Sequence, residues 1–430
     1  MISDATLVRS VMVVFAFGLA GAGTSALKEI VIASEFGVSR LVDAYQLTVT
    51  LLQWPVLIFG TVLAGALVPM VARIRSLDPI TLNVFRAESI GAVLLVAPVL
   101  VLLLYGVAFA LFDSSWMALP DGLMIHIQPM LWPIAIGTGI SGVGVVFAAW
   151  IMADGRHANT LLQALPHLVV IAALFVFGSS EPVLVWGTVA GFAIFTVASW
   201  LSVDRNQRVL RVSFRFSSLH WNALLVAMAT LALGQFFVGL ISIVDQFFAA
   251  RLGEGAIASL GYASRILALL LTLTALAISR GMLPVFSRSL VESPDMFAGL
   301  IRRWSLLAFG FGVVSGAALA LCSDWLVAVV YERGAFTAQD TEQVAYLLRY
   351  STLQTPFYFA GLVMVAGLLA RQQHKAITSI AIVNGCVKIL LAVWLVPIFG
   401  LPGLLSATAG VYAISCAGCV IALVRSKETF

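Results

Sequence analysis

Charged side chains are scarce in this chain of 430 residues. Asp, Glu, Lys and Arg together make up only 10% of it, whereas hydrophobic residues make up 61%. Soluble domains contain about 45–50% apolar and about 25% charged residues. This shortage of charge excludes an ordinary soluble globule, a disordered chain and a nucleic-acid binder. A mean hydropathy of +1.05 indicates a polytopic membrane protein instead.

Cysteine is also scarce, since the chain has only 4. Cys322, Cys386, Cys416 and Cys419 all lie in or beside apolar stretches, and the last two form a C-x-x-C pair. A zinc site needs further His, Cys or acidic ligands, and this pair has none nearby in the sequence. We therefore interpret all four as packing residues and expect neither a metal nor a cofactor.

Long apolar runs dominate the sequence. A helix needs about 20 apolar residues to cross a bilayer, and exposed backbone groups in hydrocarbon cost several kcal/mol each, so these runs are expected to be helices. The sequence predicts an all-α fold of about twelve transmembrane helices. The predicted spans are 8–36, 43–72, 87–111, 128–153, 159–177, 182–203, 222–252, 256–286, 304–330, 345–370, 376–399 and 401–424.

Lys and Arg are distributed unequally between alternate loops. One set of loops holds only Arg40, Arg251 and Arg333, and the other set, with both termini, holds the large majority. The positive-inside rule places the richer set, and hence both termini, in the cytoplasm. The richer set is Arg9, Arg73, Arg75, Arg86, Arg156, Arg205, Arg208, Arg211, Arg215, Arg288, Arg302, Arg303, Arg371, Lys375, Arg425 and Lys427.

The two halves of the chain share an ordered pattern of residues. In each half an acid precedes a glycine by eight residues, and a tyrosine, a proline and an arginine follow. The matching pairs are Glu29 and Asp245, Gly37 and Gly253, Tyr45 and Tyr262, Pro69 and Pro284, and Arg73 and Arg288.

The repeat predicts a domain organisation. We expect an N-terminal six-helix lobe (1–203), a basic cytoplasmic linker (204–221) and a C-terminal six-helix lobe (222–430). Six spans per half give both lobes the same orientation, so the lobes are expected to be pseudo-symmetric about a central cavity. That architecture is typical of transporters.

Five charged residues lie deep within the predicted spans: Lys28, Glu29, Asp245, Arg265 and Lys388. An ionised side chain at the centre of a membrane helix costs about 2.5–3.5 kcal/mol, so these should face water or one another. One interpretation is structural, with Lys28 paired to Glu29 and Asp245 paired to Lys388.

The second interpretation is functional. Lys28, Arg265 and Arg280 would bind an anionic head group, because ammonium and guanidinium groups suit phosphate oxygens. Arg280 lies four residues before Pro284 and could instead snorkel to the inner surface. Glu35, Asp43 and Arg349 lie nearer the outer ends, where they could be ordinary interface residues.

Four stretches carry a family resemblance. They are ALKEIVIASEFGVSRLVDAYQL, VDQFFAARLGEGAIASLGYASRI, YERGAFTAQDT and ARQQHKAITSIAIVNGCVKILLAVWLVPIFGLPGL. In this order they resemble the MurJ (MviN) lipid II flippases, members of the multidrug/oligosaccharidyl-lipid/polysaccharide exporter superfamily. YERGAFTAQDT is the most specific, because composition alone does not explain a loop of that sequence.

The resemblance implies a flippase that moves a polyprenyl-pyrophosphate-linked peptidoglycan precursor across the bacterial inner membrane by alternating access, without enzymatic activity. It implies that Lys28 and Arg265 take the places of basic cavity residues, with Glu29 beside Lys28. It also implies that Asp43 matches the acid after the outer glycine. We expect a lipid-linked glycan and membrane lipids as partners, no nucleic acid, and function as a monomer.

The chain departs from the family pattern in several places. The family often has a basic residue where this chain has Ala22, and a basic pair where this chain reads LLQWPV. Members of the family typically have fourteen helices, whereas twelve are predicted for this chain. Some relatives bind sodium between acids on the seventh and eleventh helices. This chain keeps Asp245 and Asn384 but has Lys388 at the second acidic position, so we predict that the Lys388 ammonium replaces the ion.

The departures leave other functions open. An exporter of another lipid-linked oligosaccharide, such as an exopolysaccharide unit, is the main alternative. A cation-coupled drug antiporter would want acids as the main cavity charges, whereas this cavity is predicted to be mixed or basic. A glycosyltransferase would need acid pairs on sizeable loops, and residues 113–127 and 204–221 are poor in them.

Overall fold

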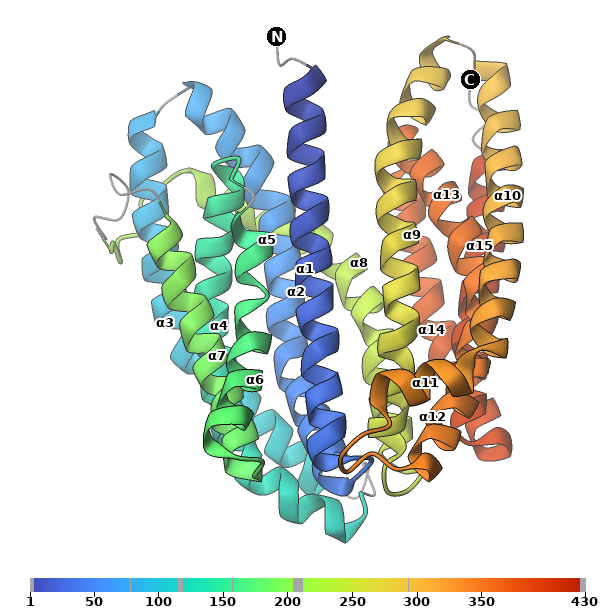
Figure 1. The fold of residues 1–430 in the computed structure, drawn as a ribbon. Helices are drawn as coiled ribbons and strands as arrows, with labels where there is room; N and C mark the ends of the chain where they lie inside the picture. The colour runs from blue at the N-terminus through green and yellow to red at the C-terminus, as the bar shows by residue number, and fades with distance from the viewer. Residues whose placement is uncertain are drawn as a thin grey trace. The chain divides into compact units, whose positions relative to one another are not determined.

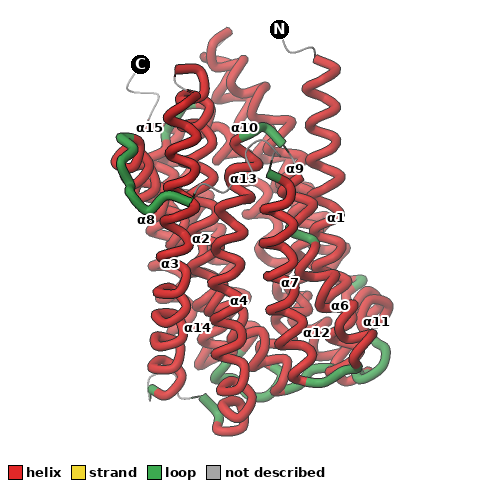
Figure 2. The backbone as a smooth tube through the Cα atoms, turned by 90° about the vertical axis from the view of Figure 1, so that its left-hand side faces the viewer, coloured by secondary structure: helices red, strands yellow, loops and turns green. Residues whose placement is uncertain are grey.

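The computed structural model describes residues 4–77, 79–114, 119–156, 158–203, 212–292 and 294–425. Within these ranges all regular secondary structure is helical and there is no strand, as Figure 2 shows. Short loops join most successive helices. Helices satisfy all of their backbone hydrogen bonds locally, which is what an apolar solvent demands.

The helices are labelled in Figure 1. They are α1 (Asp4–Phe36), α2 (Arg40–Leu77), α3 (Pro79–Asp113), α4 (Asp121–Ala153), α5 (Ala158–Leu162), α6 (Leu165–Phe177), α7 (Glu181–Ser202), α8 (His220–Ala249), α9 (Ala256–Glu292), α10 (Pro294–Leu321), α11 (Ser323–Tyr331), α12 (Ala338–Ser351), α13 (Thr355–Ala370), α14 (His374–Phe399) and α15 (Leu401–Arg425), with a 3₁₀ turn at Thr352–Gln354.

The prediction of an all-helical membrane protein is confirmed. Among the described residues, eleven helical stretches are long and apolar enough to span a bilayer, and each overlaps one of the predicted spans. The remaining predicted span, 8–36, corresponds to α1, where the side chains of residues 4–16 lie outside the described part.

The chain divides into two compact units. Unit 1 comprises Met1–Phe36 and Arg40–Gln235, and unit 2 comprises Gly37–Ser39 and Phe236–Phe430. In unit 1, α4 packs against α2, α3 and α7; in unit 2, α13 packs against α9, α10 and α15. The boundary near residue 235 falls inside the continuous helix α8.

The three residues of the α1–α2 turn belong to unit 2 because of specific contacts there. Gly37 has φ +60°, and a Cβ at this position would collide with the backbone carbonyl of Ala335. The buried Tyr262 hydroxyl donates to the Gly37 carbonyl at 3.1 Å. Glycine is needed here because only it combines positive φ with such a close approach.

Two predicted spans in the second half differ from the observed helices. The span 304–330 is divided at Cys322, where α10 ends and the nine-residue α11 begins. Arg349 of α12 explains this break in part, since its Nε donates to Ser323 Oγ at 2.9 Å and its guanidinium pairs with Asp324. These contacts hold α11 against α12 rather than in line with α10.

The span 345–370 is also interrupted. A 3₁₀ turn separates α12 from α13, which has a proline in its first turn, Pro356. Proline has no N–H to donate, so a helix tends to restart at it. Thr355 Oγ1 donates to the Gly312 carbonyl of α10 at 2.8 Å, which fixes the start of α13 against its neighbour.

Candidate functional site

In unit 1, Lys28 and Glu29 form an ion pair about two turns before the end of α1. The Lys28 side chain is only 10% exposed, and its Nζ lies 3.1 Å from a Glu29 carboxylate oxygen. The same ammonium lies 5.7 Å from the centroid of the Tyr45 ring on α2. The negative face of an aromatic ring attracts a cation, so Tyr45 adds to the stabilisation of Lys28.

The surroundings of this pair are also polar. The Tyr45 hydroxyl and Thr188 Oγ1 of α7 share a hydrogen bond of 2.8 Å, so α2 and α7 are joined beside Lys28. Asp43, which is 2% exposed, lies in the first turn of α2. The structure thus brings Lys28 and Glu29 together, with Asp43 on the helix that supplies Tyr45.

In unit 2, Lys388 of α14 is fully buried and surrounded by oxygen atoms. Its Nζ lies 2.5 Å from Asp245 Oδ1 of α8. It also donates to Thr408 Oγ1 at 2.6 Å and to the Leu404 carbonyl at 3.1 Å, both on α15. One carboxylate and two neutral oxygens therefore surround the ammonium.

Asn384 lies one turn before Lys388 on α14. Its Nδ2 donates to Ser415 Oγ of α15 at 3.1 Å. Asn384 and Lys388 therefore both connect α14 to α15, but only Lys388 contacts Asp245 through a described ion pair. The predicted pair of Asp245 and Lys388 is present, whereas a replacement of sodium by the ammonium stays a prediction.

The other predicted basic residues lie on α9. Arg265 is exposed and lies three residues after the fully buried Tyr262. The side chain of Arg280 lies outside the described residues.

Sequence reasoning missed Glu88 of α3, which is fully buried. Its carboxylate accepts hydrogen bonds from Ser217 N at 2.8 Å, Ser217 Oγ at 3.0 Å, Ser218 N at 3.2 Å and Trp221 Nε1 at 2.7 Å. Glu88 thereby holds the start of α8 against α3 within unit 1. The residues that bind Glu88 lie about 130 positions further along the chain, so no local pattern in the sequence pointed to it.

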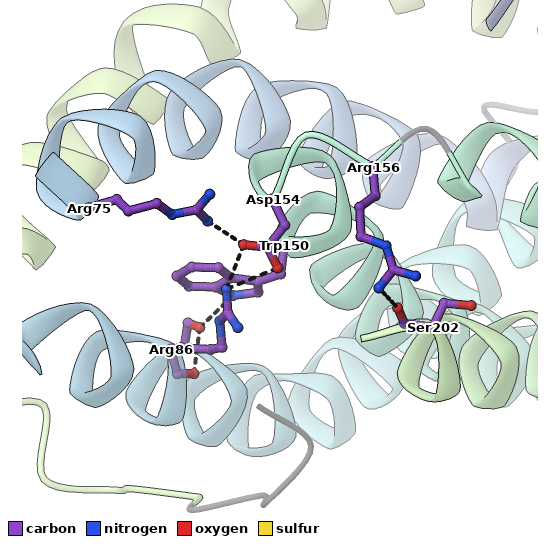
Figure 3. Close-up of polar contacts among 7 residues, drawn as sticks. Arg75, Arg86, Trp150, Asp154, Arg156 and Ser202 are labelled. Atoms are coloured by element: carbon purple, nitrogen blue, oxygen red, sulfur yellow. Dashed lines mark hydrogen bonds and ion pairs between the residues drawn. The ribbon is translucent and has the colours of Figure 1, made fainter. Parts of the chain in front are cut away.

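A second polar cluster in unit 1 joins α2, α3 and the end of α4 (Figure 3). Asp154 pairs with Arg75 and, at 3.1 Å, with Arg86. The Arg86 guanidinium lies 4.4 Å from the Trp150 ring and is only 7% exposed. Arg156 donates to the Ser202 carbonyl at 2.8 Å. These arginines, predicted as loop charges, tie helix ends together.

The polar contacts of these residues are ion pairs and hydrogen bonds within the protein. In the part of the chain that the structure describes, no three His, Cys, Asp or Glu side chains gather closely enough to hold a metal ion. The free cysteines include Cys416, whose Sγ donates to the Phe357 carbonyl at 3.0 Å. That contact agrees with a packing role for this cysteine.

A family model described as "MurJ: Lipid II flippase MurJ" matches residues 158–430, which is more than half of the chain. This chain belongs to the MurJ family. The match includes α8, α9 and α14, which carry Asp245, Arg265 and Lys388.

Curated MurJ relatives are similar to this chain at moderate identity. A probable lipid II flippase MurJ of Rhizobium tropici is 31% identical over 238 residues, which is 52% of this chain and 44% of that protein. The lipid II flippase MurJ of Burkholderia cenocepacia is 24% identical over 93% of this chain and 80% of its own length. The chain thus spans less than half of the first of these relatives.

Solved structures share the fold. "Lipid II flippase MurJ, inward closed conformation" superposes with a TM-score of 0.81 at 19% identity, over 95% of this chain and 87% of that one. An inward-facing multidrug resistance MATE family transporter of the MOP superfamily gives a TM-score of 0.76 at 14% identity, over 97% and 98%. These likenesses show the MurJ/MATE fold, and the family match adds the MurJ assignment.

Proposed function

We propose that this chain is a flippase, a transporter and not an enzyme, that moves a lipid II-like peptidoglycan precursor across the membrane by alternating access. The observation that carries the proposal is the MurJ family match over residues 158–430. The fold shared with a MurJ flippase over 95% of the chain supports it. Division of the chain into two compact helical units is the organisation that alternating access requires.

The proposed head-group site consists of Lys28, Arg265 and Arg280, with Glu29 and Asp43 as neighbouring acids. Pyrophosphate oxygens are strong acceptors for ammonium and guanidinium donors. The exposure of Arg265 supports this assignment, and Lys28 would have to leave its pair with Glu29 to bind the head group. Lys28 would exchange the Glu29 carboxylate for a phosphate and would stay positively charged throughout.

We assign a second role to the polar contacts in unit 2. Lys388 would supply by its own ammonium the positive charge that, by family resemblance, some relatives take from sodium. The short contact with Asp245 supports this role, and Asn384 would brace the same pair of helices. Transport would then be independent of sodium at this position.

The main alternative cargo is another lipid-linked oligosaccharide, such as an exopolysaccharide unit. The specific observation in its favour is the absence of basic residues at Ala22 and along LLQWPV, where the family pattern has them. A cation-coupled drug antiporter has less support, because the likeness to MATE transporters shows the fold alone.

The location and orientation are proposed from charge. The strong excess of Lys and Arg in one set of loops favours a bacterial inner-membrane protein with both termini in the cytoplasm. We propose that one chain suffices for transport, since each half contributes its own helical unit.

The deciding experiment is depletion of the protein in its host, followed by identification of the undecaprenyl-linked intermediate that accumulates on the inner side. Accumulation of lipid II supports the first cargo, and accumulation of a different glycan supports the alternative. Normal levels of every such intermediate would refute a flippase function.

A variant series tests the head-group site separately. Lys28→Ala together with Arg265→Ala should reproduce the accumulation while the protein still inserts in the membrane. Lys375→Ala is a matched control, because it removes an exposed positive charge at the start of α14. Normal flux in the double variant would show that the head group binds elsewhere, without affecting the cargo assignment.

A further inference from the structure

Unit 2 contains an apolar groove that the proposed transport does not use. Its volume is about 480 Å³, and its walls come from α10, α13 and α15. Helix α13 packs against both of the others, and the three helices lie together in Figure 1. Leu306 is 62% exposed and Val424 is 57% exposed, so the groove opens on the surface of the unit.

The length of the groove matches one leaflet of a bilayer. Its α10 lining begins at Ala298 and ends at Phe309. At a rise of 1.5 Å per residue, this stretch is about 16 Å long. The hydrocarbon core of a membrane is about 30 Å thick, so the groove is about as long as one leaflet of that core.

The two ends of the groove differ in charge. Arg302 and Arg371 line the end near the start of α10 and the ends of α13 and α15, which charge distribution places in the cytoplasm. Phe309 and Phe357 line the other end. Basic pockets between helices on the cytoplasmic side are suited to anionic lipid head groups.

Arg371 is held in place by its neighbours. Its Nη1 donates to the Leu423 carbonyl at 3.0 Å, and its guanidinium lies 4.8 Å from the Phe297 ring. Burial lowers the pKa of Arg371, because the charged group is partly removed from water, yet arginine stays charged at neutral pH. A partly desolvated cation gains from a phosphate partner.

Ser305 adds a polar group to the groove wall, one turn after Arg302 on α10. It is 5% exposed, and its Oγ has no hydrogen-bond partner among the described residues. A buried hydroxyl without a partner is destabilising, and an ester oxygen of a lipid would provide an acceptor at this depth.

We propose that this groove binds one anionic phospholipid of the cytoplasmic leaflet. Its phosphate would lie against Arg302 and Arg371, and one acyl chain would lie along α10 and α13. A phospholipid fits better than the polyprenyl tail of the proposed cargo, because that tail is much longer than one leaflet. The site would be separate from the head-group site, so its failure would leave the proposed function untouched.

Binding is tested on the purified full chain after removal of native lipid. Phosphatidylglycerol and phosphatidylcholine with identical acyl chains are titrated, and bound lipid is counted by native mass spectrometry. Phosphatidylglycerol should bind more tightly, and Arg302→Gln should weaken it about fivefold. Arg303→Gln is the matched control: it removes an equally exposed charge from the next position on α10, outside the groove lining, and should leave binding unchanged.

The position of the acyl chain is tested by photolabelling in phosphatidylcholine vesicles that contain a phosphatidylglycerol with a diazirine on its chain. Label should appear on peptides that contain Met364 and Cys416, and Ala413→Phe, which fills the deep end of the groove, should abolish it. The binding test uses Arg302→Gln because this variant keeps the hydrogen bond between Arg371 and the Leu423 carbonyl, so weaker lipid binding would not result from loss of that contact.

Three results would overturn the proposal. Equal binding of the two phospholipids would remove the role of charge, and label that Ala413→Phe does not reduce would remove the role of the groove. Displacement of the label by a polyprenyl phosphate, but not by excess phosphatidylglycerol, would assign the groove to the cargo tail instead.

Discussion

The ion pair of Lys388 and Asp245 makes a quantitative prediction about stability. Lys388→Met removes the ammonium and leaves the Asp245 carboxylate, 22% exposed, without its contact at 2.5 Å. Asp245→Asn leaves a fully buried ammonium with only neutral oxygens around it, those of Thr408, Leu404 and the introduced amide. Loss of one partner from a buried pair costs about 3–5 kcal/mol, because the remaining charge is uncompensated.

The double variant should be less damaged than the two single variants together. With both charges gone, no ion is left in the apolar interior, and replacement of a whole buried pair is often close to neutral. We expect a coupling energy of about 2–3 kcal/mol between the two sites, obtained from a double-mutant cycle. For a unit of this size, 3 kcal/mol corresponds to a fall in Tm of about 6–12 °C.

The measurement is thermal unfolding of the purified variants in one detergent, followed by near-ultraviolet circular dichroism. Lys375→Met on the same helix is the control, because Lys375 is exposed and its loss should change stability by no more than about 0.5 kcal/mol. The reasoning is refuted if each single variant costs less than about 1 kcal/mol and the two costs simply add.

Three further predictions concern single positions. Lys388→Asp places a second carboxylate beside Asp245, so sodium should raise the Tm of this variant but not of the unmodified chain. An equal rise in both would contradict the proposal that the Lys388 ammonium takes the place of a sodium ion. Glu88→Gln should lower the free energy of unfolding by about 3 kcal/mol, because an amide cannot accept hydrogen bonds from all four donors that reach this carboxylate. The control Glu342→Gln, on the exposed face of α12, should change it by almost nothing. Thr337→Ala removes the capping box of α12 and should cost about 1 kcal/mol, visible as faster hydrogen exchange in its first turn; unchanged exchange there would argue against the cap.

The membrane-spanning helices were predictable because hydrocarbon imposes a strong and simple constraint on the sequence. Runs of apolar residues predicted the helices, and the breaks within predicted spans were missed. No proline or glycine marks the break at Cys322. The flanking residues Leu321 and Trp325 are apolar, as they would be in a continuous membrane helix. It depends on Arg349, whose contacts with Ser323 and Asp324 are not visible to a local pattern.

The candidate site was predictable only where charge was conspicuous. Lys388 and Asp245 could be paired from sequence because a single charge in a membrane helix demands a partner. Thr408 could not be found in this way, since a threonine in a helix can satisfy its hydroxyl on its own backbone, and this one does so at Leu404 as well. Glu88 was missed because all of its donors come from a stretch far along the chain.

Helix α8 has a mechanical consequence for any transport cycle. The division between the two units falls between Gln235 and Phe236, in the interior of this helix and next to Gly234, rather than in a flexible connector. A rearrangement that passes through this point has to bend or unwind a rod whose backbone bonds are expensive to break in lipid. Gly234 lies at this point, and its replacement by alanine should stiffen the helix there, because glycine has the greatest backbone freedom of any residue.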